Sequence, residues 1–101
     1  MTKEEILHIL QQNKDILKKF KVKKIGIFGS AVKNELNKYS DIDFVVEFEQ
    51  GEASIKNFGG LVLFLENTFH RPVDLLTIKG VENIRIKSIK HQIMKSIEYA
   101  Y

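Results

Sequence analysis

The chain has 101 residues and a formal net charge of +3, a length that suits one domain, residues 1–101, with a single modest hydrophobic core. Its lysines are dispersed and form no basic stripe with interleaved aromatics, so direct nucleic-acid binding is not expected. The absence of cysteine excludes disulfides and thiolate chemistry, and the lack of a signal-peptide core or a membrane-length apolar run predicts a cytoplasmic protein without membrane contact.

The first predicted element is a helix from about Thr2 to Phe20. Thr2 and Glu5 have the spacing of a capping box at its start. Apolar residues recur along it at helical spacing, so one face is expected to pack on a sheet as core. The residues of this face are Ile6, Ile9, Leu10, Ile16, Leu17 and Phe20.

A strand is predicted over Lys24–Phe28, a short apolar run that breaks at Gly29 and Ser30. Gly29 allows a sharp turn and a close approach of the backbone to a ligand, and Ser30 is expected to cap a short helix through its side-chain oxygen. Free N–H groups and the positive end of that helix would then face a phosphate. Lys33 is a candidate for a supporting phosphate contact.

Asp41 and Asp43 follow a predicted loop over Asn34–Ser40 and lead into a second predicted strand, Phe44–Phe48. Side chains two apart on a strand point to the same face, so both carboxylates are expected to look toward one site. Magnesium prefers oxygen ligands and typically takes one or two carboxylates together with waters and phosphate oxygens. We therefore predict Asp41 and Asp43 as Mg²⁺ ligands, with a nucleoside triphosphate supplying further oxygens.

The polar stretch Glu49–Ser54 is predicted as a mobile loop beside the site. A helix follows over about Ile55–Phe69, in which Gly59-Gly60 either permits close packing or marks the true helix start. A third predicted strand, Val73–Thr77, carries Asp74. This carboxylate is predicted either to complete a second metal site or to accept the proton of the attacking hydroxyl.

The last predicted helix spans about Val81–Tyr99. Ile86, Ile89, Ile93 and Ile97 recur along it at spacings of three and four, and most of this stripe is expected to be core. Helices thus alternate with strands through much of the chain. The pattern predicts an α/β (α+β) fold with a small mixed sheet covered by helices.

Each of these signals has an ordinary explanation when it is taken alone, since Gly-Ser is a common turn and an aspartate can simply begin a strand after a polar loop. Carboxylates are nevertheless depleted in strands. Three of them, placed on strands beside a Gly-Ser turn, indicate nucleotidyl transfer. His8, His70 and His91 lack metal-ligand spacing and are not expected to act in the site.

At these residues the chain resembles the minimal nucleotidyltransferases, small relatives of DNA polymerase β with a signature of Gly-Ser, ten residues and Asp-x-Asp. Gly29-Ser30 and Ser40-Asp41-Ile42-Asp43-Phe44 match that signature, and Arg71-Pro72-Val73-Asp74 resembles the strand of the third carboxylate. One departure is Lys33-Asn34, where the family commonly has Arg-Gly. Lys33 keeps a positive charge near the phosphates but lacks the bidentate fork of a guanidinium.

The resemblance implies a polymerase β-like fold and an antitoxin of the type encoded beside a HEPN-domain ribonuclease. Such antitoxins silence the toxin by transferring AMP from ATP to a toxin tyrosine. The small size of the chain independently favours an acceptor that arrives on a partner. The alternatives are a catalytically idle member that acts by binding and occlusion, and a regulator that binds nucleic acid.

Overall fold

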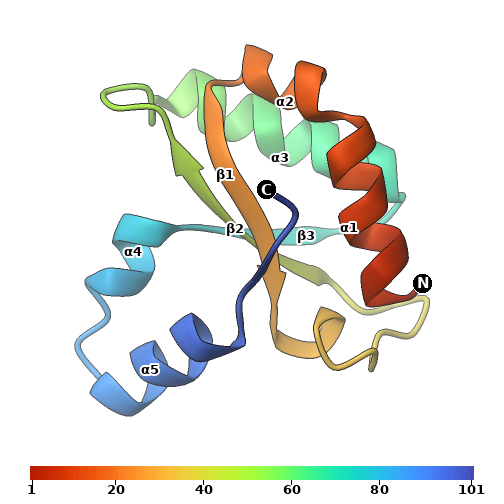
Figure 1. Ribbon diagram of the computed structural model, residues 1–101, viewed down its shortest axis with the longest axis vertical. Helices are drawn as coiled ribbons and strands as arrows, with labels where there is room; N and C mark the ends of the chain where they lie inside the picture. Colours follow the sequence, from red (N-terminus) through yellow and green to blue (C-terminus); the bar gives the residue numbers. More distant parts are fainter.

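The computed structural model describes residues 1–101 and contains five α-helices, one 3₁₀ turn and four strands (Figure 1). In chain order these elements are α1 (Lys3–Gln12), α2 (Lys14–Lys19), β1 (Val22–Phe28), the 3₁₀ turn η1 (Gly29–Ala31), β2 (Ile42–Phe48), α3 (Ile55–Phe69), β3 (Val73–Thr77), α4 (Ile78–Glu82), α5 (Lys87–Ser96) and β4 (Glu98–Tyr99).

The strands form one sheet in the order β3-β2-β1-β4. β1 is antiparallel to both β2 and β4, whereas β2 and β3 are parallel. A parallel pair needs a long crossover connection, and α3 supplies it. The predicted small mixed sheet packed by helices is therefore confirmed, as is the α+β class.

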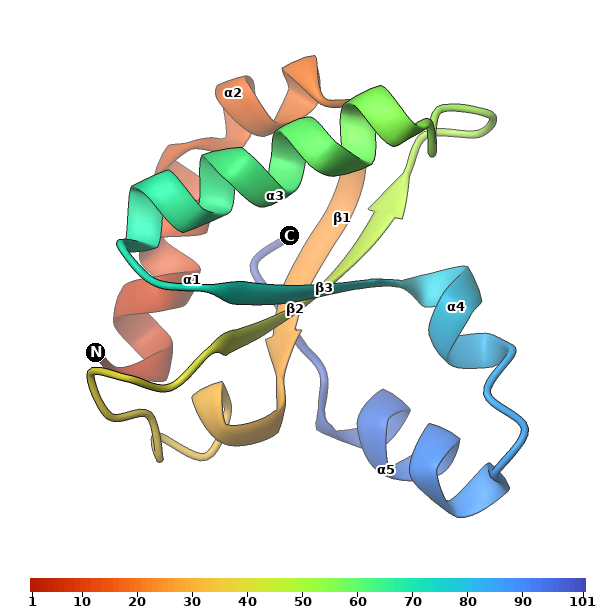
Figure 2. The ribbon, with the colours of Figure 1, turned by 180° about the vertical axis from the view of Figure 1, so that it is seen from behind.

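Helices lie on both faces of this sheet. Both views place α1, α2 and α3 on one side of it and α4 and α5 on the other (Figures 1 and 2). The main core lies under the first group and joins Ile6, Leu10, Leu17, Ile25, Ile27, Ile42, Phe44, Val46, Leu61 and Leu65. A smaller cluster on the opposite face joins Phe28, Val45 and Val81, with Ile78, Ile84, Ile93 and Ile97 packed against it.

The alternation of β2 explains these two faces. Ile42, Phe44 and Val46 point to the main core. Asp43 and Val45 occupy the intervening positions and therefore point to the face of α4 and α5. Because that face is only partly covered by helices, one of its ends is left free for polar side chains.

The prediction of one opening helix was wrong, because Asn13 ends α1 and separates it from α2. The Asn13 side-chain amide donates to the carbonyl of Ile9 at 2.8 Å, which is how asparagine competes with regular helix bonding. The N-cap at Thr2 is confirmed, since its hydroxyl accepts from the Glu5 amide at 3.2 Å. Within the predicted apolar face, Ile16 is exposed.

The helix over Ile55–Phe69 is confirmed with its predicted bounds. The Ser54 hydroxyl caps it by accepting from the Asn57 amide at 3.1 Å. Of the two readings of Gly59-Gly60, close packing holds, because a Cβ on Gly60 would lie 2.8 Å from the Phe20 ring.

The predicted helix over Val81–Tyr99 was also wrong, since the chain forms α4, then α5, then β4 there. The Thr77 hydroxyl starts α4 early by accepting from the Gly80 amide at 2.9 Å. The last residues join the sheet instead of the helix, with Tyr99 opposite Gly26. The absence of a Cβ on Gly26 makes this pairing possible, because such an atom would lie 2.5 Å from the Glu98 carbonyl oxygen.

The predicted core stripe of this region is only half correct. Ile93 and Ile97 pack against the smaller cluster. Ile86 and Ile89, by contrast, are 59% and 43% exposed, and no residue of α5 is fully buried. None of the helices combines the length and apolarity that a membrane span requires.

Candidate active site

Gly29 makes the turn that ends β1. Its φ of +67° lies in the left-handed region, which glycine adopts at little cost. It is also the residue against which the carboxyl of Asp43 packs, because a Cβ at Gly29 would collide with an Asp43 carboxyl oxygen. The glycine is therefore needed twice, for its backbone conformation and for the close approach of a carboxylate.

Asp43 and Asp74 lie side by side on neighbouring strands. They are register partners in the parallel β2–β3 pair, so both side chains leave the sheet on the same face. They lie close enough to form a side-chain hydrogen bond when one of them carries a proton. Asp43 also stands opposite Phe28, the residue before the Gly29 turn. Two carboxylates and the turn thus meet at one end of the sheet.

This grouping raises the pKa of Asp43 from 3.8 to about 6. Desolvation by burial is the largest cause, followed by the hydrogen bond to Asp74 and by the negative charges of Asp74 and Asp41. Ionisation of all three carboxylates is therefore unfavourable in the absence of a cation. A divalent cation or a positively charged group would relieve that repulsion.

Asp41 is exposed and lies just before β2, at the end of the connection from β1. Within this connection, the Asn37 amide donates to the Ser40 hydroxyl at 3.1 Å. Arg71 holds the connection from the other side, because its guanidinium donates to the carbonyls of Asn37 at 3.0 Å and Ser40 at 3.3 Å. The arginine therefore fixes the backbone that leads into Asp41.

Arg71 is the positioning residue that sequence reasoning missed. In the sequence it stands out only as part of the segment before Asp74. Its role arises only when the loop that contains Asn37 and Ser40, more than thirty residues earlier, folds onto the connection between α3 and β3. In the sequence, the only signal of this role is a cationic residue shortly before β3.

Ser30 does not cap a helix, in contrast to the prediction. The element after β1 is a single 3₁₀ turn over Gly29–Ala31, so Ser30 lies inside it. A single 3₁₀ turn has only a small macrodipole. An anion would therefore be bound here by the free backbone N–H groups at the start of the turn. Lys33 is exposed in the turn that follows and forms no salt bridge.

No three acidic or histidine side chains are already arranged around a metal position. Asp43 and Asp74 form a close pair, and Asp41 adds an exposed carboxylate nearby. This donor set fits Mg²⁺ bound together with a triphosphate, since that ion needs only one or two carboxylates and keeps waters and phosphate oxygens.

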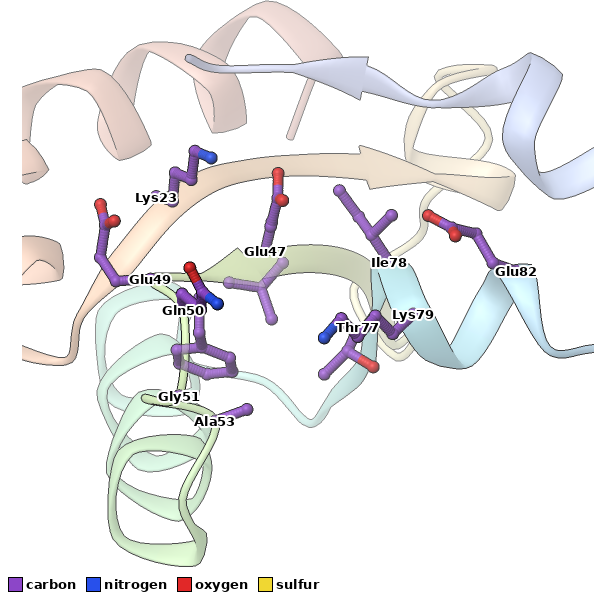
Figure 3. Close-up of a pocket in the computed structure, with 12 residues that line it drawn as sticks. Lys23, Glu47, Glu49, Gln50, Gly51, Ala53, Thr77, Ile78, Lys79 and Glu82 are labelled. Atoms are coloured by element: carbon purple, nitrogen blue, oxygen red, sulfur yellow. The ribbon is translucent and has the colours of Figure 1, made fainter.

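A hollow of about 400 Å³ lies at the other end of the sheet (Figure 3). Figure 3 shows Glu47, Thr77 and Glu82 reaching it from β2, β3 and α4. The stretch Glu49–Ser54 contributes Glu49, Gln50, Gly51 and Ala53 to its lining. The prediction that this loop lies beside the carboxylates was wrong, because β2 separates it from Asp43 by roughly 20 Å at about 3.3 Å per residue.

A mixed sheet that brings paired carboxylates against a Gly-Ser turn is an arrangement suited to a nucleotidyltransferase. The sequence matches the family model described as nucleotidyltransferase domain over residues 9–100. The chain therefore belongs to the nucleotidyltransferase domain family.

Relatives in two archaea extend this match. The chain is 41% identical over 88 residues to a Methanocaldococcus jannaschii protein named "Putative protein adenylyltransferase MJ1379", a match that covers 85% of this chain and 88% of the relative. It is 33% identical over 95 residues to protein adenylyltransferase MntA of Thermococcus cleftensis, with 93% and 95% covered.

Solved structures agree on the fold. A structure described as "putative minimal nucleotidyltransferase" aligns with a TM-score of 0.76 at 21% identity and covers 97% of this chain and 95% of that one. A toxin–antitoxin structure with AMP-PNP aligns with a TM-score of 0.65 at 19% identity, covering 100% of this chain and 73% of the other. Together these findings confirm the predicted minimal nucleotidyltransferase.

Proposed function

We propose that the protein is a Mg²⁺-dependent protein adenylyltransferase that acts as an antitoxin. In this proposal it transfers AMP from ATP to a hydroxyl of a toxin partner, which we expect to be a tyrosine of a HEPN ribonuclease. The observation that carries the proposal is the packing of the Asp43 carboxyl against Gly29 with Asp74 beside it.

The relatives support the choice of nucleotide and acceptor class. Two of them, 33% and 41% identical to this chain, are named as protein adenylyltransferases, and the matches span most of each chain. The toxin–antitoxin structure that shares the fold contains AMP-PNP, an ATP analogue. The small size of the chain agrees with an acceptor that is brought by a partner.

The proposed reaction is an in-line displacement at the α-phosphorus of ATP. A bond forms between the acceptor oxygen and the α-phosphorus, the bond between the α-phosphorus and the bridging oxygen breaks, and pyrophosphate leaves. Gly29 and Ser30 would hold the terminal phosphates through backbone N–H groups, with Lys33 as a supporting cation. The close approach of Asp43 to this turn fits a triphosphate that spans both.

The three carboxylates would bind the metal ion and accept the proton. Asp41, Asp43 and Asp74 would hold Mg²⁺, which neutralises the triphosphate and aligns it for attack. Asp74 could instead accept the proton of the attacking hydroxyl. The charge crowded around Asp43 is a reason to expect that this site takes up a cation and gives up a proton when it does so.

Intact mass spectrometry tests the proposal. The protein is incubated with ATP, Mg²⁺ and the protein product of the neighbouring gene, and a nucleotide-sized mass gain is expected on that partner. The gain should vanish with Asp41→Asn and persist with Asp15→Asn, a matched control that removes an exposed carboxylate from α2.

Inhibition by occlusion is the second candidate. A stable complex with the partner and no mass gain under any nucleoside triphosphate would select this alternative.

A further inference from the structure

The helix α5 exposes apolar side chains that the fold does not use. Ile86, Ile89, Ile93 and Ile97 share one face at spacings of three and four. The second half of this stripe packs on the sheet. Its first half continues beyond the sheet, where Ile86 is 59% exposed, and Figure 1 shows the first turn of α5 pointing away from the rest of the molecule.

The same segment concentrates positive charge. Residues 83–97 contain no acidic side chain, and their cations at neutral pH are Arg85, Lys87, Lys90 and Lys95. Four charges exceed the net +3 of the whole chain, so the rest of the surface is close to neutral. None of the four forms a salt bridge, since the one salt bridge of the structure joins Lys3 and Glu98.

The cations and an apolar side chain meet on the outer side of the helix. Lys87, Lys90, His91 and Met94 line a hollow of about 230 Å³ there. Met94 is 38% exposed. We call this surface the α5 face and define it by Ile86, Lys87, Ile89, Lys90, Met94 and Lys95.

The buried side of α5 packs beside the candidate active site. Ile93 and Ile97 pack in the same cluster as Phe28. Phe28 is both the neighbour of Gly29 and the register partner of Asp43. A macromolecule that binds α5 therefore lies on the sheet face from which the carboxylates project, and it can reach them without crossing the sheet.

We infer that the α5 face is the docking surface for an acidic region of the partner protein that carries the acceptor hydroxyl, an inference that rests on the proposed function. Charge complementarity selects an acidic partner. The interleaved aliphatic and methionine side chains select a protein, because protein interfaces centre on such residues. Single-stranded nucleic acids are instead bound largely by stacking on aromatic rings, and residues 83–97 contain no Phe, Tyr or Trp, with His91 as their single aromatic ring.

Matched charge reversals test this inference. The triple variant Lys87→Glu, Lys90→Glu, Lys95→Glu is compared with a control triple that changes net charge equally on the opposite side of the sheet. The control reverses Lys18, Lys19 and Lys56, which are exposed on α2 and α3. Affinity for the neighbouring-gene product is measured by calorimetry, and circular dichroism verifies the fold of both variants.

The α5 triple is expected to weaken the complex roughly tenfold or more at low salt. The difference should shrink at high salt because the contacts are electrostatic. The control triple should stay within about twofold of the wild type, since isolated surface charges contribute little. The KM for ATP should not change in either variant.

A second pair of variants tests the apolar part without changing charge. Ile86→Ser with Ile89→Ser should weaken the complex. The matched control, Ile55→Ser with Leu63→Ser, removes side chains that are 94% and 63% exposed on α3 and should not.

Wild-type affinity in both α5 variants would overturn the inference. So would binding of a fluorescein-labelled single-stranded RNA by the wild type that the α5 triple alone loses, because the face would then be a nucleic-acid contact. Failure of the proposed function remains separate: a complex that depends on α5 but shows no AMP transfer refutes the enzyme and keeps the docking surface.

Discussion

Replacement of Asp43 by Asn should stabilise the nucleotide-free protein while abolishing transfer. The structure packs this carboxyl against Gly29 and beside Asp74, and its pKa rises from 3.8 to about 6. Asn has nearly the same shape, carries no charge, and can donate its amide hydrogen to Asp74. The substitution therefore removes the repulsion and keeps the packing.

The sign of the effect follows from the direction of the pKa shift. Because the pKa in the folded protein is higher than 3.8, the folded state keeps its proton between about pH 4 and 6 while the unfolded chain loses it. Stability that is present at pH 4 is thus lost as pH rises through 6. Above pH 6 the full penalty of a charged Asp43 remains.

The size of the penalty can be bounded. The shift from 3.8 to about 6 corresponds to about 3 kcal/mol before screening. Because the side chain is only half-buried, solvent screening reduces this to about 1 kcal/mol. For a domain of this size, that is about 4–8 °C in melting temperature.

Thermal unfolding without divalent cations measures this effect at pH 4.5 and pH 7.5. Asp43→Asn should melt higher than the wild type at pH 7.5, with a smaller gap at pH 4.5, and Asp15→Asn should not reproduce the pattern. A variant that is equally stable or less stable at pH 7.5, or a gap in melting temperature that does not change with pH, would show that the charge of Asp43 does not destabilise the folded protein.

Four further substitutions test the Gly29 turn, the loop before β2 and the packing of α3. Gly29→Ala should cost about 1–2 kcal/mol for its positive φ alone, and displacement of the Asp43 carboxyl should lower the transfer rate well beyond the change in melting temperature. Arg71→Ala removes two hydrogen bonds to the loop before β2, so kcat should fall with a loss of about 1–3 kcal/mol in unfolding free energy. Gly60→Ala should lower the melting temperature because the new Cβ would meet the Phe20 ring. Gly59→Ala places its Cβ in open space and should raise the free energy of unfolding by up to about 1 kcal/mol. Equal effects at the two glycines would contradict the packing of Gly60 on Phe20.

Local patterns predicted the parts of the molecule that depend on local rules. The run before Gly29, the alternation from Asp41 into β2 and the capped helix over Ile55–Phe69 were each readable from neighbouring residues. The sequence also assigned Asp43 and Asp74 to strands, whereas the parallel β2–β3 pairing that makes them register partners came from the assembled sheet.

Tertiary contacts decided the parts that sequence reasoning missed. The end of the chain has a helical period through Ile97, but pairing with Gly26 draws its last residues into the sheet. Arg71 acts on a loop that is distant in sequence. The misplacement of the loop over Glu49–Ser54 has a local cause instead: the loop follows Phe48, at the opposite end of the strand from Asp43, so the rise per residue of a strand already sets it apart from the carboxylates.

The proposed transfer of AMP is best tested by the position of a label in ATP. The protein and the neighbouring-gene product are incubated with Mg²⁺ and ATP labelled at either the α- or the γ-phosphate. We expect label on the partner from α-labelled ATP only, and we expect it to be lost on chelation of Mg²⁺ and with Asp41→Asn. Label from γ-labelled ATP, or none from either while the complex forms, would contradict AMP transfer.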